Sequence, residues 1–233
     1  MDSGNPVTKD RVLHRYADEP LIRRYLPFIE REIIPFDYFH VYRDWLRMRK
    51  GMHRLTVLFI AESPPWRGIA GLPTGDVENY RYFYNDACRA PATLRTAILS
   101  RLDLTRSIGD DGRLPCFRDH HLFLTDTLKC AIYKDRHPSL PKSLVHAGVQ
   151  ILREEIDWLC PQYIVTMGST AFAAIREIYP GEFGGYRRLS DVPIGLVQKR
   201  ILVMPYPNSR NRGNFGDRLE SSFSLVNALI NQS

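Results

Sequence analysis

The sequence lacks the features of a membrane-spanning or secreted protein. Its 233 residues contain no window of roughly 18 uninterrupted apolar side chains, which a membrane-spanning helix needs. The first stretch, MDSGNPVTKDRVLHRY, is polar and has no apolar core of the kind that defines a signal peptide. We therefore expect no membrane partner and a location in the cytoplasm, or in the nucleus if the source is eukaryotic.

Cysteine is also scarce. The four thiols are at least 14 residues apart, so no Cys-x-x-Cys pair is present to begin a zinc or iron-sulfur site; they are Cys88, Cys116, Cys130 and Cys160. This spacing predicts reduced, mostly buried thiols. We expect no metal and no cofactor, since a metal site would require ligands that converge from distant positions.

Internal repeats, low-complexity tracts and long Gly/Ser linkers are absent, which argues against an array of domains. A chain of 233 residues can build one substantial core, and we predict a single α/β domain over residues 1–233 and a monomer. Residues 1–54 hold two helical patterns, Glu19–Ile33 and Asp37–Lys50, which we expect to pack on a core formed by residues 55–233.

From Leu55 onward, short apolar runs alternate with amphipathic stretches. The apolar runs are Leu55–Ala61, His121–Thr127, Tyr163–Gly168 and Arg200–Tyr206. The helical stretches are Ala90–Leu102, Pro141–Leu159, Ser169–Tyr179 and about Asp217–Ile230. This alternation predicts an α/β fold, a three-layer sandwich with a central, mainly parallel four-stranded sheet flanked by helices.

Ligands bind at the carboxyl ends of the strands in sheets of this kind. Glu62 follows the first run in the stretch IAESPP, whose two prolines restrict the backbone after the carboxylate. Asp126 lies near the end of the second run and Tyr206 at the end of the last. Taken alone, Glu62 could equally cap a helix or pair with an arginine, and Asp126 could form a surface ion pair with Lys129.

The formal net charge of +6 permits an anionic partner. Arginines gather in NSRNRGNFGDR, where a loop carrying Arg210, Arg212 and Arg218 suits phosphate groups, although a solvated surface loop has the same composition. The aromatic segment YRYFYND, which includes Phe83, could stack on a flat heterocycle or simply fill the core.

In this order, the segments resemble the uracil-DNA glycosylase superfamily from about Leu55 to the C-terminus. LFIAESPP is similar to the first motif, written Gly-Glu-Ala-Pro-Gly in the iron-sulfur branch, and YFYN to the base-stacking segment. LTDTLKC is similar to Thr-Asn-Ile-Val-Lys-Cys of that branch, and YIVTMGSTAFAAI to a supporting strand and helix. PYPNSRNRGNFG resembles the second motif, His-Pro-Ser-Pro-Arg-Asn in the single-strand-selective branch. The four cysteines of the iron-sulfur branch are not reproduced.

The resemblance implies roles for individual residues. It places Glu62, Ser63 and Tyr206 in catalysis, with Glu62 helping to activate or orient water. It assigns base binding to Phe83, Asn85 and Asp126, and DNA contacts to Asn208, Ser209, Arg210, Asn211 and Arg212. The loop Tyr206–Phe215 would contact the DNA backbone and wedge the duplex.

Five positions depart from the family pattern, and two of them, Ala61 and Pro65, lie in the first motif where many members have glycine. Tyr206 replaces the motif histidine, so a phenol takes the place of the usual donor to the departing base. Asp126 replaces an asparagine; its carboxylate would repel the O4 carbonyl of uracil and accept from an amino group. Ser63 lies where other branches have Asp or Asn. These departures point to a base other than uracil, to a protonated Asp126 or to weakened excision.

The resemblance implies a monofunctional DNA glycosylase that flips a deaminated or damaged base from DNA and hydrolyses its N-glycosidic bond in base excision repair. Two alternatives stay open. One is a catalytically impaired member that binds single-stranded nucleic acid or a nucleobase, and the other is a nucleotide-processing hydrolase.

Overall fold

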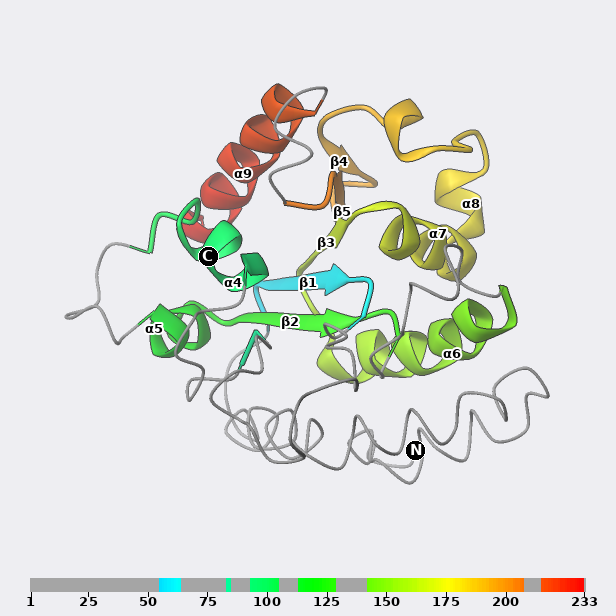
Figure 1. The fold of residues 1–233 in the computed structure, drawn as a ribbon, viewed down its shortest axis with the longest axis horizontal. Coiled ribbons are helices and arrows are strands. Elements are labelled where there is room, and N and C mark those ends of the chain that lie inside the picture. Colours follow the sequence, from blue (N-terminus) through cyan, green and yellow to red (C-terminus); the bar gives the residue numbers. More distant parts are fainter. Residues whose placement is uncertain are drawn as a thin grey trace, which may run out of the picture. The chain divides into compact units, whose positions relative to one another are not determined.

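A computed structural model describes residues 55–63, 83–84, 93–104, 113–128, 142–207 and 215–232 (Figure 1). The two N-terminal helical patterns, Asn85 and the segment Asn208–Arg212 lie outside these residues. The chain divides into two compact units. The sheet unit holds, among the described residues, 55–62, 93–104, 113–126, 159–207 and 215–232, and the second unit holds 63, 83–84, 127–128 and 142–158. The single domain over residues 1–233 stays a prediction.

The sheet unit contains a five-stranded sheet in the order β2-β1-β3-β5-β4. Its strands are β1 Val57–Ala61, β2 Leu122–Asp126, β3 Tyr163–Met167, β4 Leu196–Val197 and β5 Ile201–Met204. β2, β1, β3 and β5 pair in parallel, as the alternating pattern predicted. The prediction of four strands was wrong by one, because β4 adds an antiparallel edge next to β5.

The extra strand is a short hairpin arm. Gln198 and Lys199 both have positive φ (52° and 59°), and the N–H of Arg200 donates to the carbonyl oxygen of Val197 at 3.1 Å. Turns with two positive φ values usually carry Asn-Gly or Asp-Gly. Since the turn is Gln-Lys and the strand has two residues, neither feature marks a hairpin in the sequence.

The helices agree with most of the predicted stretches. The described elements are α4 Thr93–Leu99, α5 Arg113–Asp119, α6 Lys142–Leu159, α7 Ser169–Ile178, α8 Pro180–Phe183, the 3-10 turn η5 Leu189–Asp191 and α9 Gly216–Asn231. The short α5 and α8 were not predicted; α5 has a proline at its third residue, and α8 begins on one. Of the helices that the structure describes, none combines the length and apolarity that crossing a membrane requires.

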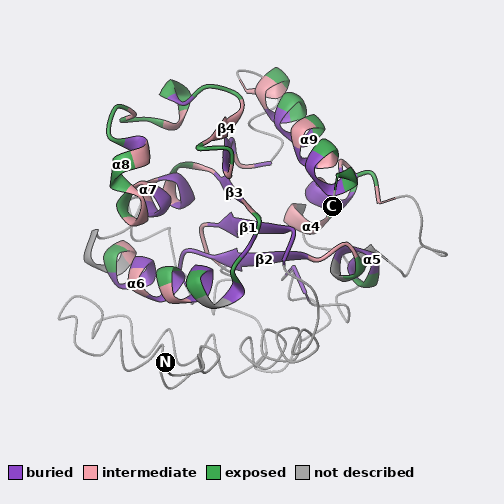
Figure 2. Ribbon diagram, turned by 180° about the vertical axis from the view of Figure 1, so that it is seen from behind, coloured by how far each residue is buried: buried purple, intermediate pink, exposed green. Residues whose placement is uncertain are grey.

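Helices of the sheet unit pack on the sheet through apolar stripes. α7 packs against β3 and β1, and α9 packs against β5. The buried side chains of α9 recur at helical spacing; they are Leu219, Ser222, Phe223, Val226, Leu229 and Ile230. Figures 1 and 2 show α9 on one side of β3 and β5 and α7 on the other, so helices cover both faces of this part of the sheet. β1 and β2 are buried along their whole length, as Figure 2 shows.

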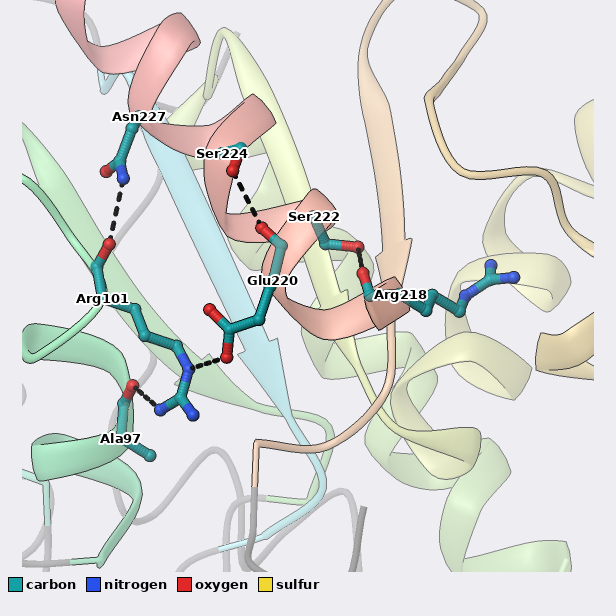
Figure 3. Close-up of polar contacts among 7 residues, drawn as sticks. All are labelled: Ala97, Arg101, Arg218, Glu220, Ser222, Ser224 and Asn227. Carbon is teal, nitrogen blue, oxygen red and sulfur yellow. Dashed lines mark hydrogen bonds and ion pairs between the residues drawn. The ribbon is translucent and has the colours of Figure 1, made fainter. Parts of the chain in front are cut away.

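A polar network joins α9 to the end of α4 (Figure 3). Arg101 donates from Nε to Glu220 at 3.0 Å and from a terminal nitrogen to the Ala97 carbonyl oxygen at 3.0 Å. Asn227 donates to the carbonyl oxygen of Arg101 at 2.9 Å and accepts from the N–H of Asp103 at 3.0 Å. We refer to Arg101, Glu220, Asn227 and the backbone of Asp103 as the α4–α9 network. It satisfies backbone groups that the end of α4 leaves without intrahelical partners.

The second unit contributes α6 up to Trp158. A Cβ atom at Gly148 in this helix would lie 2.5 Å from the carbonyl oxygen of Thr127 and 2.9 Å from Leu128 Cδ2. Glycine thus allows the helix backbone to approach this segment closely. Of the four cysteines the structure describes two, both free: Cys116 is buried and Cys160 is exposed, so the prediction of mostly buried thiols stays a prediction.

Candidate active site at the carboxyl ends of the strands

The four parallel strands end at one level. Ala61, the last residue of β1, pairs with Asp126, the last of β2. Ile60 pairs with Thr166, so β3 ends level with β1, and Met167 at that end pairs with Met204, the last residue of β5. The first and second residues after the last residues of these four strands therefore lie along a single edge of the sheet. Glu62, Gly168 and Tyr206 are among them.

Glu62 is fixed by a residue far away in the sequence. Its Oε2 atom accepts a hydrogen bond from the Thr170 hydroxyl at 2.5 Å. Thr170 lies in the first turn of α7, whose amino-terminal end favours negative charge. A hydroxyl-to-carboxylate bond of this length is a charge-assisted bond. The half-buried carboxylate is thus stabilised where the strand delivers it.

Tyr206 follows β5 and is half-buried. Burial, together with the negative charges of Asp126 and Glu62, raises the pKa of Tyr206 to about 12. A phenol is protonated at neutral pH and can donate a hydrogen bond, and the raised pKa extends that protonated range to higher pH. Asp126 and Glu62, at the ends of two other strands, thus each act electrostatically on the Tyr206 phenol.

Gly168 brings the end of β3 against the tyrosine ring. Its φ of 89° and ψ of 174° belong to a region that is essentially restricted to glycine. A Cβ atom at Gly168 would lie 3.2 Å from Cβ of Tyr206 and 3.7 Å from its Cδ2. The N–H of Gly168 also donates to the Met204 carbonyl oxygen at 3.0 Å, which ties the two strand ends together.

Asp126 is 2 % exposed, and Thr125 before it is completely buried. Taking a carboxylate out of water is costly, so natural proteins seldom bury one without a use for it.

Together, Glu62, Asp126 and Tyr206 provide two carboxylates and one neutral phenol. They can stabilise developing positive charge, orient a water molecule and donate one proton in a hydrogen bond. Within the described ranges, no group of three or more His, Cys, Asp and Glu side chains is placed to hold a metal ion.

Comparison with protein-family models identifies the family of the chain. The family model described as the uracil DNA glycosylase superfamily matches residues 52–229, which is most of the chain. The chain belongs to this superfamily. No curated protein matches it closely enough to supply a named relative.

Membership of the uracil-DNA glycosylase superfamily confirms the resemblance drawn from the motifs and the predicted α/β fold. It associates the chain with DNA glycosylase-type function. Tyr206 and Asp126, which depart from the family's motif residues, lie at the strand ends described above. The roles of individual residues stay predictions.

The predicted site residues fall into three groups. Glu62, Asp126 and Tyr206 come together in the sheet unit. Ser63 and Phe83 belong to the second unit. There Phe83 is buried and meets Tyr84 edge-on, with ring centroids 4.9 Å apart. The others, Asn85, Asn208, Ser209, Arg210, Asn211 and Arg212, lie outside the described residues.

Arg218 does not lie in a phosphate-binding loop, which corrects one alternative for the arginine-rich stretch. It is in the first turn of α9, half-buried, and donates to the carbonyl oxygens of Val192 at 2.6 Å and Val203 at 3.5 Å. Its guanidinium connects the segment before β4 to β5. Since one of its terminal nitrogens donates to both backbone carbonyls, Arg218 has a structural role.

Two residues of the site, Gly168 and Thr170, were not predicted. The stretch MGSTAF was interpreted as a supporting strand and helix. A signal was present, because these residues follow a predicted strand at the same edge as Glu62 and Tyr206. The sequence contains no indication, however, that the hydroxyl of Thr170 points to a carboxylate 108 positions earlier.

Proposed function

We propose that the protein is a monofunctional DNA glycosylase that removes a deaminated or damaged base by hydrolysis of the N-glycosidic bond. The convergence of Glu62, Asp126 and Tyr206 at the ends of parallel strands carries the proposal. Membership of the uracil-DNA glycosylase superfamily supports it.

Glu62 is proposed to act on the sugar side of the bond. As the bond between C1′ and the base nitrogen breaks, positive charge builds up on the sugar, and a nearby carboxylate lowers the energy of that state. The same carboxylate can orient the water molecule whose oxygen bonds to C1′. The departing base takes up a proton, so the products are a free base and an abasic sugar.

Tyr206 and Asp126 are proposed to face the base. The protonated phenol of Tyr206 can donate to the oxygen that becomes negative as the base leaves. Asp126 can accept from a ring N–H or an amino group, and it disfavours a carbonyl oxygen at the same place. This pair favours a base that offers both an acceptor and an N–H donor along its edge.

The remaining predicted residues complete the proposal. Phe83 and Asn85 would bind the extruded base, and Ser63 would assist next to Glu62. The segment Asn208–Arg212 would contact the DNA backbone, where its two arginines suit phosphate oxygens. Base flipping is required, because the bond cannot be reached within the stacked duplex.

The test is a base-release panel. Single- and double-stranded oligonucleotides carrying uracil, hypoxanthine or xanthine are incubated with the protein, and abasic sites are measured by alkaline cleavage. We expect one base to be released faster than the others, and Glu62→Gln to abolish release while DNA affinity changes little.

The same panel can contradict the proposal. If no base is released from any strand while binding persists and weakens steeply with salt, the protein is a binding member that has lost excision. Release that is undiminished in Glu62→Gln would remove Glu62 from the mechanism and with it the observation on which the proposal depends.

A further inference from the structure

We infer that Thr170 is a positioning residue for Glu62: its hydroxyl holds the carboxylate in the orientation that the reaction requires. This inference rests on the proposed glycosylase function and extends it to a residue on α7. It starts from the hydrogen bond that the Thr170 hydroxyl donates to Glu62 Oε2 at 2.5 Å.

The direction of this hydrogen bond follows from the chemistry of the two groups. A hydroxyl has one proton to donate, and an ionised carboxylate can only accept. Threonine hydroxyls in helices commonly donate to a backbone carbonyl three or four residues earlier. At Thr170 the proton is donated to Glu62 instead, which connects β1 to the first turn of α7.

The side chain of Thr170 is held rigidly enough to fix the position of the Glu62 carboxylate. β-branched side chains have few χ1 rotamers in a helix, so the helix backbone sets the direction of the hydroxyl. The helix itself is anchored by four buried side chains, Ala171, Phe172, Ala174 and Ile175. It packs on β3 and β1, and Glu62 follows β1 directly. Packing and hydrogen bond thus fix the carboxylate relative to the same strands.

A second contact shows that this turn touches both reactive groups. Gly168, two residues before Thr170, packs so closely against Tyr206 that a Cβ atom on the glycine would lie 3.2 Å from Cβ of the tyrosine. The segment Gly168–Thr170 therefore contacts both Tyr206 and the Glu62 carboxylate. A change confined to the hydroxyl of Thr170 should affect Glu62 and leave the packing of Tyr206 intact.

The kinetic experiment compares Thr170→Val, which removes the hydroxyl and keeps the β-branched shape, with Thr170→Ser, which keeps the hydroxyl. On the base that the wild type releases fastest, we expect Thr170→Val to lower kcat by roughly 10- to 100-fold, since small displacements of a reacting group have effects of this order. KM and DNA affinity should change less than about twofold. Thr170→Ser should recover most of the rate, and Thr96→Val, at an exposed position of α4, should have no effect.

A second measurement does not depend on activity. Urea unfolding midpoints of the wild type, Thr170→Val, Glu62→Gln and the double variant form a double-mutant cycle. We expect the shift caused by Thr170→Val to be smaller in the Glu62→Gln background, because the charge-assisted bond is already weakened there.

The two measurements separate this inference from the proposed function. If the wild type releases no base, the proposed function fails, and with it the positioning role, whatever the unfolding cycle gives. If the wild type releases a base and Thr170→Val retains its kcat, or if the cycle is additive, the positioning inference is overturned while the glycosylase proposal stands. A reduced kcat restored by serine, together with a non-additive cycle, supports it.

Discussion

The α4–α9 network and the strand-end cluster use similar side chains in opposite ways. In the network, the cation Arg101 meets the anion Glu220, and Asn227 both donates to and accepts from the end of α4. In the cluster of Glu62, Asp126 and Tyr206, two carboxylates raise the pKa of a tyrosine that burial already disfavours as an anion.

Complementary partners are expected where contacts serve the fold. Placing groups that disfavour one another's ionisation close together costs free energy of folding. Such groups are concentrated at functional sites. We therefore propose that the network serves stability and that the cluster serves the reaction. Substitutions in the two regions test this distinction.

The largest effect is expected for Glu62→Gln. Loss of a group that acts directly in the reaction should lower kcat by about 10²- to 10⁴-fold, with little change in unfolding. The matched control is Glu220→Gln, whose side chain is 63 % exposed and whose ion pair with Arg101 should contribute at most about 1 kcal/mol. Base release and urea unfolding measured on both variants would contradict the comparison if the two behaved alike.

Gly168→Ala should affect both properties, because the glycine supports the fold and contacts the cluster. Backbone in its conformation costs a residue with a Cβ on the order of 1–3 kcal/mol. The added methyl group would also press on Tyr206. We expect a lower unfolding midpoint and slower base release, measured at a temperature where the variant is fully folded. Loss of stability with an unchanged rate would show that the position of the Tyr206 ring does not matter.

Asn227→Ala should lower stability and leave the rate per folded molecule unchanged. The substitution removes two hydrogen bonds at the end of α4, each with a net contribution of about 0.5–1.5 kcal/mol. Urea unfolding measures the loss, and base release under native conditions provides the comparison. A reduced rate in the folded variant would mean that the network is coupled to the active site.

The smallest effect concerns the titration of Tyr206. Its folded pKa of about 12 exceeds the unfolded value near 10, so the folded state keeps the proton longer. The stabilisation from this group is fully present below pH 10 and is lost as pH rises through about 12. Tyr206→Phe should therefore lose less stability than the wild type over this interval.

Asp126→Asn tests the electrostatic contribution within the same titration. Removing one negative charge should lower the pKa of Tyr206, although it stays above 10 because burial is the larger cause. NMR of tyrosine labelled with ¹³C at Cζ follows the titration directly. An unchanged pKa would mean that Asp126 and Tyr206 do not interact.

Local patterns in the sequence predicted the parallel strands and the longer helices well. Strands β1, β3 and β5 are short apolar runs, and α7 and α9 follow helical periodicity, so each signal lies within one contiguous segment. The two-residue β4 was missed because its turn, Gln198-Lys199, lacks the glycine or asparagine that usually accompanies positive φ. Arg218 was grouped with the arginines of a polar loop although it lies within the predicted helical stretch Asp217–Ile230, and the structure places it in α9, which begins at Gly216.

By itself, the sequence determined the family, the parallel α/β arrangement and the choice of Glu62, Asp126 and Tyr206 as candidates, because each follows a strand-forming run and such runs end at one edge of a parallel sheet. Only the tertiary structure decided that Thr170 bonds Glu62, that Gly168 packs against Tyr206 and that the pKa of the Tyr206 phenol rises to about 12. These properties depend on distances between side chains that are far apart in the chain, and on burial, which arises only when the strands and helices pack together.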